Sequence, residues 1–150
     1  MRVTLILLGL FVAVAGYTAL VPDSGRAETQ FKTEWDKKYL GDKNKDTALY
    51  KAWEGKSTCG VCHTNTTRGE TKHNNYGEAL KKYLKSEDAN PLKFKEKKAN
   101  PAGAVKAQKK ILDAFEKAGK EHSDPSDKKS PTFGELIKSG KLEKSTVATD

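Results

Sequence analysis

"STCGVCHT", residues 57–64, contains both cysteines of the chain, Cys59 and Cys62, and one of its three histidines, His63. The spacing C-x-x-C-H is typical of a site at which a c-type haem is attached covalently. Two thiols three positions apart, on about one helical turn, can reach the two vinyl groups on one edge of a porphyrin. The next residue then presents its imidazole to the iron from the same face. The stretch therefore predicts Cys59 and Cys62 as thioether residues and His63 as the proximal iron ligand.

Three other uses of the cysteines explain less of the sequence. A disulfide within C-x-x-C closes too small a loop to constrain the chain much, and it leaves His63 without a role. A thioredoxin-like redox pair is expected beside a βαβ pattern, which the sequence lacks. A zinc site would have only two cysteines and three histidines to draw on. The neighbouring Cys62 and His63 rarely serve one tetrahedral ion together.

The first 27 residues have the layout of a secretory signal: Arg2 supplies a short positive region, and residues 3–21 are almost wholly apolar. Small residues at positions 25 and 27 predict cleavage after Ala27. The apolar run also approaches the length of a membrane span, about 18 to 20 residues, so an uncleaved N-terminal anchor is the alternative. In both cases the chain from residue 28 is expected outside the cytoplasm, in the periplasm or facing it from the membrane. Membrane association is expected only if the segment stays uncleaved.

The composition predicts one domain with a thin core of its own. Hydrophobic residues make up 35% of the whole chain, and the apolar N-terminal run contributes many of them. A large buried cofactor would supplement such a core. The apolar periodicity predicts an all-α fold, with no alternating strand pattern and no internal repeat. Helices are expected over residues 28–40, 47–55, 76–85, 101–119 and 132–140.

Several residues mark where these helices begin and which way they face. Asp46 is the expected N-cap of the second helix, and Asn100 with Pro101 the expected start of the fourth. Thr132 and Glu135 have the spacing of a capping box. The fourth helix is expected to turn its larger apolar residues inward, namely Val105, Ile111, Leu112 and Phe115.

At these residues the chain resembles the cytochrome c families. The stretch "DTALYKAWEGKSTCGVCHT", residues 46–64, looks like the first helix of a small single-haem cytochrome c and its attachment motif. "NNYGEAL" (74–80) and "SPTFGELIKSGKL" (130–142) are similar to a set of small exported monohaem proteins without an established activity. The resemblance implies a cytochrome c-like helical domain over residues 28–150, wrapped around one covalent haem c. The C-terminal tail is expected to be frayed from about residue 141.

One departure from that family pattern concerns the second axial ligand of the iron. Small cytochromes c usually supply a methionine downstream of the motif, but the only methionine here is Met1. A His/Met iron is therefore excluded by counting. The remaining candidates are His73, ten residues after His63, then His122, a lysine or asparagine, or a site holding water or no ligand. The sequence leaves these alternatives open.

Aromatic and basic residues suggest the surroundings of the cofactor. Trp53 and Tyr76 are the expected contacts of the haem ring among the aromatic residues that could shape a pocket, which also include Trp35, Tyr83, Phe94 and Phe115. Ten lysines lie between Lys81 and Lys110, and the formal net charge is +8. Such a surface can steer a protein toward an acidic redox partner, although a solvated helix exterior gives the same pattern. Nucleic acid is not expected as a partner, because the chain is exported and lacks a recognition motif.

The sequence thus predicts a carrier of electrons rather than an enzyme, since no nucleophile–base constellation is present. Two other functions depend on an open sixth position of the iron. One is the binding of small ligands such as NO or CO, and the other is peroxide reduction, which also needs an acid–base group beside the iron. If the chain binds no haem, the alternative is an exported protein that is stabilised by zinc or has a structural role.

Overall fold

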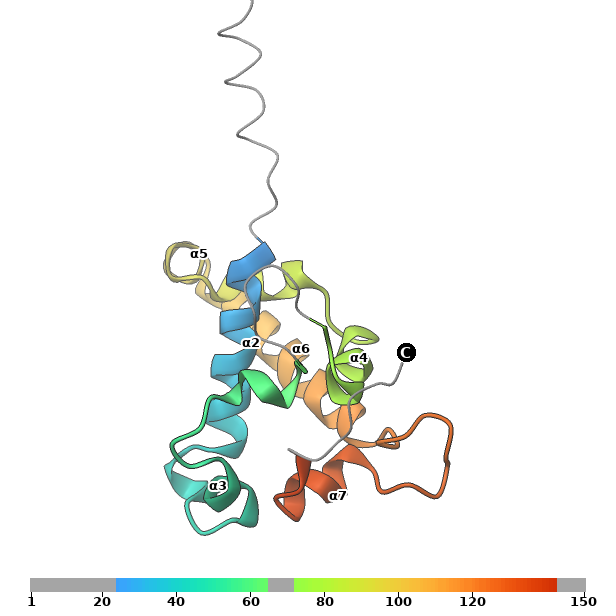
Figure 1. Ribbon diagram of the computed structural model, residues 1–150. Coiled ribbons are helices and arrows are strands. Elements are labelled where there is room, and N and C mark those ends of the chain that lie inside the picture. The colour runs from blue at the N-terminus through green and yellow to red at the C-terminus, as the bar shows by residue number, and fades with distance from the viewer. Residues whose placement is uncertain (1–23, 65–71, 143–150) are drawn as a thin grey trace, which may run out of the picture.

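Two helices, α2 (Ser24–Tyr39) and α6 (Pro101–Gly119), form the frame of the computed structural model and pack against each other (Figure 1). The structure describes residues 24–64 and 72–142. The side chain of Glu34 on α2 is almost fully buried and accepts a hydrogen bond of 2.6 Å from Gln108 on α6. Lys37 forms an ion pair of 2.7 Å with the other oxygen of Glu34. The buried carboxylate is therefore paired, as a buried charge must be.

The shorter elements surround this frame. In chain order they are η1 (Asp42–Asn44), α3 (Ala48–Trp53), η2 (Thr58–Val61), α4 (Asn75–Lys81), η3 (Ser86–Leu92), α5 (Phe94–Ala99) and α7 (Phe133–Lys138). In Figure 1, α3 and α7 lie at one end of the frame and α5 at the other. Helices of about two turns are marginal alone, so their stability comes from packing on α2 and α6. The all-α fold class is confirmed for the described residues, whose only β pairings are two isolated bridges.

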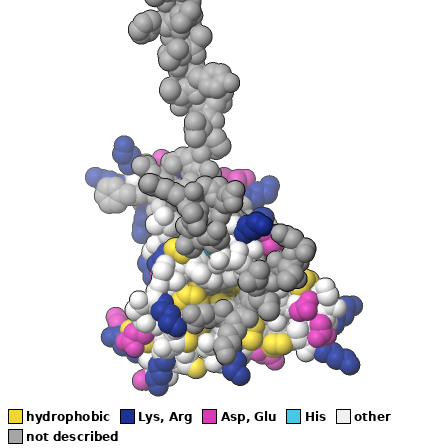
Figure 2. All heavy atoms as spheres, in the orientation of Figure 1, with side chains coloured by type: hydrophobic (Ala, Val, Ile, Leu, Met, Phe, Trp, Pro, Cys, Tyr) yellow, Lys and Arg dark blue, Asp and Glu magenta, His cyan; other side chains and the backbone are white. Residues whose placement is uncertain are grey.

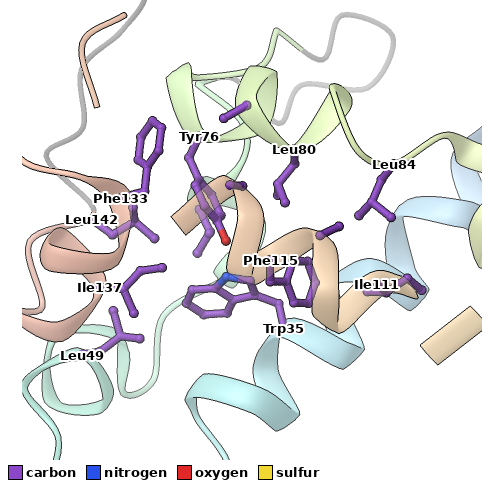
Figure 3. Packing of buried hydrophobic residues seen from close by; sticks show 14 of the residues in the cluster. Trp35, Leu49, Tyr76, Leu80, Leu84, Ile111, Phe115, Phe133, Ile137 and Leu142 are labelled. Atoms are coloured by element: carbon purple, nitrogen blue, oxygen red, sulfur yellow. The ribbon is translucent and has the colours of Figure 1, made fainter. Parts of the chain in front are cut away.

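The core joins side chains from α2, α3, η2, α4, α6 and α7. Figure 3 shows Trp35 of α2, Phe115 of α6 and Tyr76 of α4 converging between the helices, with side chains of α3 and α7 at one end. Leu142 is only 1% exposed and belongs to this cluster. Leu142 thus belongs to the core, and the rest of the predicted tail, residues 143–150, lies outside the described part.

The helix ends follow the predicted caps with one exception. Asn100 accepts from the amide of Gly103 at 2.8 Å, and Thr132 with Glu135 forms the predicted capping box. The prediction of Asp46 as a cap was wrong by one residue. Thr47 has the extended backbone of an N-cap and accepts from the amide of Tyr50 at 3.2 Å.

The predicted inward face of α6 was wrong at Val105, which is 66% exposed. The buried stripe of α6 is built largely from small residues, namely Ala104, Ala107, Ile111, Ala114, Phe115 and Ala118. These positions recur every three or four residues, and Val105 lies one position away from the first of them. Ile111 and Phe115 are buried as expected, and Leu112 is partly buried against the core.

None of the helices within residues 24–64 and 72–142 is long and apolar enough to cross a membrane. The apolar run of the predicted signal or anchor lies outside these residues. Helix α2 begins at Ser24, so the predicted cleavage point after Ala27 falls in its first turn.

Two glycines with positive φ provide a matched test of the turn after α7. Gly140 has φ +70°, and a Cβ there would lie 2.6 Å from the carbonyl oxygen of Ala48. Gly55 has φ +73°, but a Cβ there would meet nothing within 4 Å. Each Gly→Ala change should cost about 1–2 kcal/mol for the left-handed backbone. We expect Gly140→Ala to lower the free energy of unfolding by about 1 kcal/mol more than Gly55→Ala, because it adds the collision with α3. Urea unfolding checks this, and equal losses would contradict it.

Candidate functional site

The cysteines and His63 lie on a short loop, residues 58–63, which we call the cysteine loop. Its first part is the single 3-10 turn η2, and the amides of Cys62 and His63 both donate to the carbonyl of Cys59, at 3.3 and 3.1 Å. Val61 is 1% exposed and anchors the loop in the core. Both cysteines lie within the described residues and are half-buried, and no disulfide joins them. The turn therefore leaves both cysteine side chains partly exposed.

A cavity of about 370 Å³ opens beside the cysteine loop, and Cys59, Cys62 and His63 all line it. Its walls come from distant parts of the chain: Phe31 and Trp35 of α2, Leu80 and Leu84 in and after α4, and Phe115 of α6. The volume lies within the range of small-molecule sites, about 300–1,000 Å³. The three residues of the motif thus face one common space with largely apolar walls.

His73 reaches the same cavity as the direct neighbour of His63. The two residues form an antiparallel bridge, flanked by hydrogen bonds of 3.0 Å from Thr64 N to Lys72 O and from Asn74 N to Cys62 O. This pattern makes them a non-hydrogen-bonded pair, in which the side chains lie on the same face and close together. Their ring centroids are 4.7 Å apart with 41° between the planes. Nδ1 of His73 also lies 3.6 Å from a carboxylate oxygen of Glu78.

This arrangement does not place His73 opposite His63 across a porphyrin plane. Two imidazoles on opposite sides of one metal ion, each bonded at about 2 Å, have ring centroids about 6 Å apart. The observed rings are closer than that and project from the same face of the bridge. The prediction that His73 is the distal ligand is therefore not supported by its position. His73 would have to swing away from His63 to serve as that ligand.

The other candidate ligand, His122, lies elsewhere. It is exposed, its Nδ1 is 2.6 Å from the carbonyl oxygen of Ser130, and it pairs with Thr132 in a second isolated bridge. His122 does not line the cavity beside the cysteine loop. The structure therefore brings together His63 and His73 but not His122.

The two aromatic residues predicted to contact the haem ring, Trp53 and Tyr76, are buried in the core. Trp53 is buried behind the cysteine loop, where a Cβ on Gly60 would lie 3.6 Å from its ring. Tyr76 is fully buried and packs on Phe133 with ring centroids 5.2 Å apart, and its hydroxyl points toward Trp35 in Figure 3. Burial raises the pKa of the Tyr76 hydroxyl well above its usual value. Neither Trp53 nor Tyr76 lines the cavity, whose aromatic walls are Phe31, Trp35 and Phe115.

Some atoms around the cavity lack partners that buried polar groups normally have. Nδ1 of His63 and Oγ1 of Thr58 are buried without a hydrogen bond among the described residues. An unpaired buried group of this kind costs about 1–3 kcal/mol, and native structures rarely leave one unexplained. A ligand in the cavity that fixed His63 and offered an acceptor or donor nearby would remove part of this cost. The two thiols and the imidazole that line the cavity are also the donor set that the covalent attachment of a haem requires.

The lysines between residues 81 and 110 do not form one uncompensated patch. Lys81 pairs with Glu78 at 3.0 Å, Lys82 with Glu121 at 2.5 Å and Lys110 with Asp88 at 2.6 Å. Figure 2 shows Lys and Arg side chains spread around the edge of one face, with apolar side chains nearer its middle. Lys81 also lines the cavity, so positive charge stands at the edge of the site itself.

Comparison of the chain with protein-family models, curated proteins and solved structures finds no match. The resemblance to the cytochrome c families therefore stays a prediction from the sequence.

Proposed function

We propose that this protein is an exported c-type cytochrome that carries electrons through one haem, held covalently by Cys59 and Cys62. The observation that supports this best is the shared cavity: both thiols and the imidazole of His63 line one space with apolar walls. Under this proposal the signal segment directs the chain to the periplasm, or holds it there as an anchor.

The residues of the cysteine loop and of the cavity would have separate roles in holding the haem. Cys59 and Cys62 would supply the two thioethers, and His63 the proximal ligand. Val61 anchors the loop between them in the core. Trp35, Leu80 and Phe115 would exclude water from the ring. When bound, haem c supplies a one-electron iron couple, whose potential depends on its axial ligands and burial.

A redox partner with an acidic surface would fit the basic exterior. Exposed lysines on α5 and α6, such as Lys97, Lys98 and Lys106, raise the rate of encounter without requiring a tight complex. Lys81 at the cavity edge would place part of this charge next to the haem.

A second candidate function is the binding of small ligands such as NO or CO at an open sixth position. The position of His73 favours it, because His73 lies beside His63 rather than opposite it. Peroxide reduction would require the same open position and an acid–base group beside it. His73 lies beside His63, so it would have to swing to the other side of the ring to act as that group.

The visible spectrum of the dithionite-reduced protein, before and after CO, separates these functions. For an electron carrier we expect sharp low-spin bands that CO does not change, because a strong sixth ligand occupies the iron. The His73→Ala variant then tests whether His73 swings to that position, in which case the variant becomes sensitive to CO. If CO readily shifts the Soret band of the parent protein, ligand binding replaces electron transfer as the proposed function.

A further inference from the structure

Asn74 holds three consecutive carbonyl groups of the cysteine loop. Its side-chain amide donates to the carbonyls of Gly60 and Val61, at 3.1 and 2.9 Å, and its backbone amide donates to the carbonyl of Cys62 at 3.0 Å. Asn74 is only 4% exposed. Every carbonyl between the first cysteine and His63 is thus bonded to this one residue.

The same side chain also begins α4. Its Oδ1 accepts from the backbone amide of Gly77 at 2.9 Å, so Asn74 is the N-cap of that helix. A single turn such as η2 has no following turn whose amides could satisfy its carbonyls. An asparagine side chain can cap α4 with its acceptor oxygen and satisfy the loop carbonyls with its donor amide. Serine or aspartate at this position would keep the cap and the backbone bond to the Cys62 carbonyl, but would lose the two side-chain bonds to the carbonyls of Gly60 and Val61.

Gly77 allows this close approach of α4 to the cysteine loop. A Cβ at Gly77 would lie 2.2 Å from the carbonyl oxygen of Cys62 and 2.9 Å from Cδ2 of His73. Asn74 and Gly77 together therefore clamp the loop, and we call this pair the Asn74–Gly77 clamp. The clamp touches the backbone of Cys62 and the side chain of His73, both of which line the cavity.

A second Asn-x-x-Gly sequence caps α6 without such a role. Asn100 accepts from the amide of Gly103 at 2.8 Å, as Asn74 does from Gly77 at 2.9 Å. Asn100 is exposed, and neither Asn100 nor Gly103 lines the cavity. The two caps thus share one local geometry. They differ because the side-chain amide of Asn74 also donates to the carbonyls of Gly60 and Val61.

We propose that Asn74 is a positioning residue for haem attachment, which holds the cysteine loop so that both thiols and His63 face one cavity. This inference rests on the proposed function. It assigns to Asn74 a role beyond capping α4, namely fixing the conformation of the cysteine loop before the thioether bonds form. Each thiol would then add across a vinyl group. The sulfur would bond to one vinyl carbon and the thiol proton would go to the other, so the S–H bond and the C=C π bond are consumed and the addition itself needs no oxidant.

Matched serine variants test the proposal in the full chain, produced together with a cytochrome maturation system. Asn74→Ser and Asn100→Ser both keep an N-cap, but serine at 74 is too short to reach the loop carbonyls as well. We expect the fraction of chains with covalent haem, measured by intact mass after denaturation, to fall on the order of tenfold in Asn74→Ser. Asn100→Ser should load as the parent does.

Folding is measured separately in a Cys59→Ala/Cys62→Ala background, which cannot attach haem. There we expect both serine variants to keep their helicity and cooperative urea unfolding, while hydrogen exchange at the amides of the cysteine loop becomes faster only in Asn74→Ser. Asn74→Asp, which keeps the shape and the cap but loses the donor, is the second variant.

The outcomes separate the inference from the proposed function. If the parent carries haem and Asn74→Ser loads equally well, the inference is overturned and the proposed function stands. Equal losses in Asn74→Ser and Asn100→Ser, or unfolding of both variants at position 74, would make Asn74 a structural cap only. A parent chain without covalent haem would end the proposed function, and the inference with it.

Discussion

Replacing Cys59 and Cys62 together by alanine is expected to remove covalently bound haem completely. The chain has no other cysteine, so no second pair of thiols can substitute. Both side chains are half-buried at the cavity, and alanine there removes only the sulfur atoms, so we expect the helical fold to persist. Intact mass after denaturation, with the protein produced beside a cytochrome maturation system, measures the loss directly.

The controls for this experiment are close in the sequence. Ser57→Ala changes an exposed residue just before η2 whose side chain does not cap the turn, and it should load haem as the parent does. His63→Ala keeps both thiols, so the mass should still include haem, while the reduced spectrum changes because the proximal ligand is lost. A parent protein of apo mass that contains one zinc ion per chain would contradict the proposal and favour the zinc-stabilised alternative.

Gly77→Ala is expected to destabilise the fold strongly, although alanine is normally the better residue in a helix. The gain in helix propensity is about 1 kcal/mol. The new Cβ would lie 2.2 Å from a backbone oxygen, that of Cys62, which cannot rotate away as a side chain can. Overpacking costs about 1–3 kcal/mol, and a collision with a fixed backbone atom puts the cost at the upper end, about 3 kcal/mol. After the gain in propensity we expect a net loss of about 2 kcal/mol in the free energy of unfolding. Urea unfolding in the Cys59→Ala/Cys62→Ala background measures it without haem.

Gly60→Ala is the matched control, since it lies within the same motif. A Cβ there would meet only the ring of Trp53, at the ordinary contact distance of 3.6 Å. We therefore expect Gly60→Ala to change stability by less than about 0.5 kcal/mol. A Gly77→Ala protein as stable as Gly60→Ala would show that α4 can move away from the cysteine loop at no cost, and would weaken the case for the clamp.

Much of the fold follows from local signals in the sequence. The cap at Asn100 and the capping box at Thr132 are bonds between residues three apart, so the sequence alone contains both partners. Val105 shows where this kind of reasoning stops. The buried stripe of α6 consists largely of alanines, and a search for large apolar residues does not find it.

Only the cysteine motif of the candidate site was predictable from the sequence. C-x-x-C-H points to Cys59, Cys62 and His63 because the proposed haem attachment would depend on their spacing in the chain. The partners of that motif depend on tertiary packing: Phe31 and Phe115 come from different helices, and the position of His73 depends on the register of one short bridge. Asn74 could have been suspected as the cap before "YGEAL", but its bonds to Gly60 and Val61 have no signature in the sequence.

The Asn74–Gly77 clamp has a consequence for the entropy of building the site. Its side-chain bonds join residues only 13 and 14 positions apart, whereas the walls of the cavity include Phe31 and Phe115, which are far apart in the sequence. Closing a short loop costs less conformational entropy than closing a long one. The half of the site that carries the two thiols is thus held by contacts local in the chain, and the half that would shield the ring is held by the global topology.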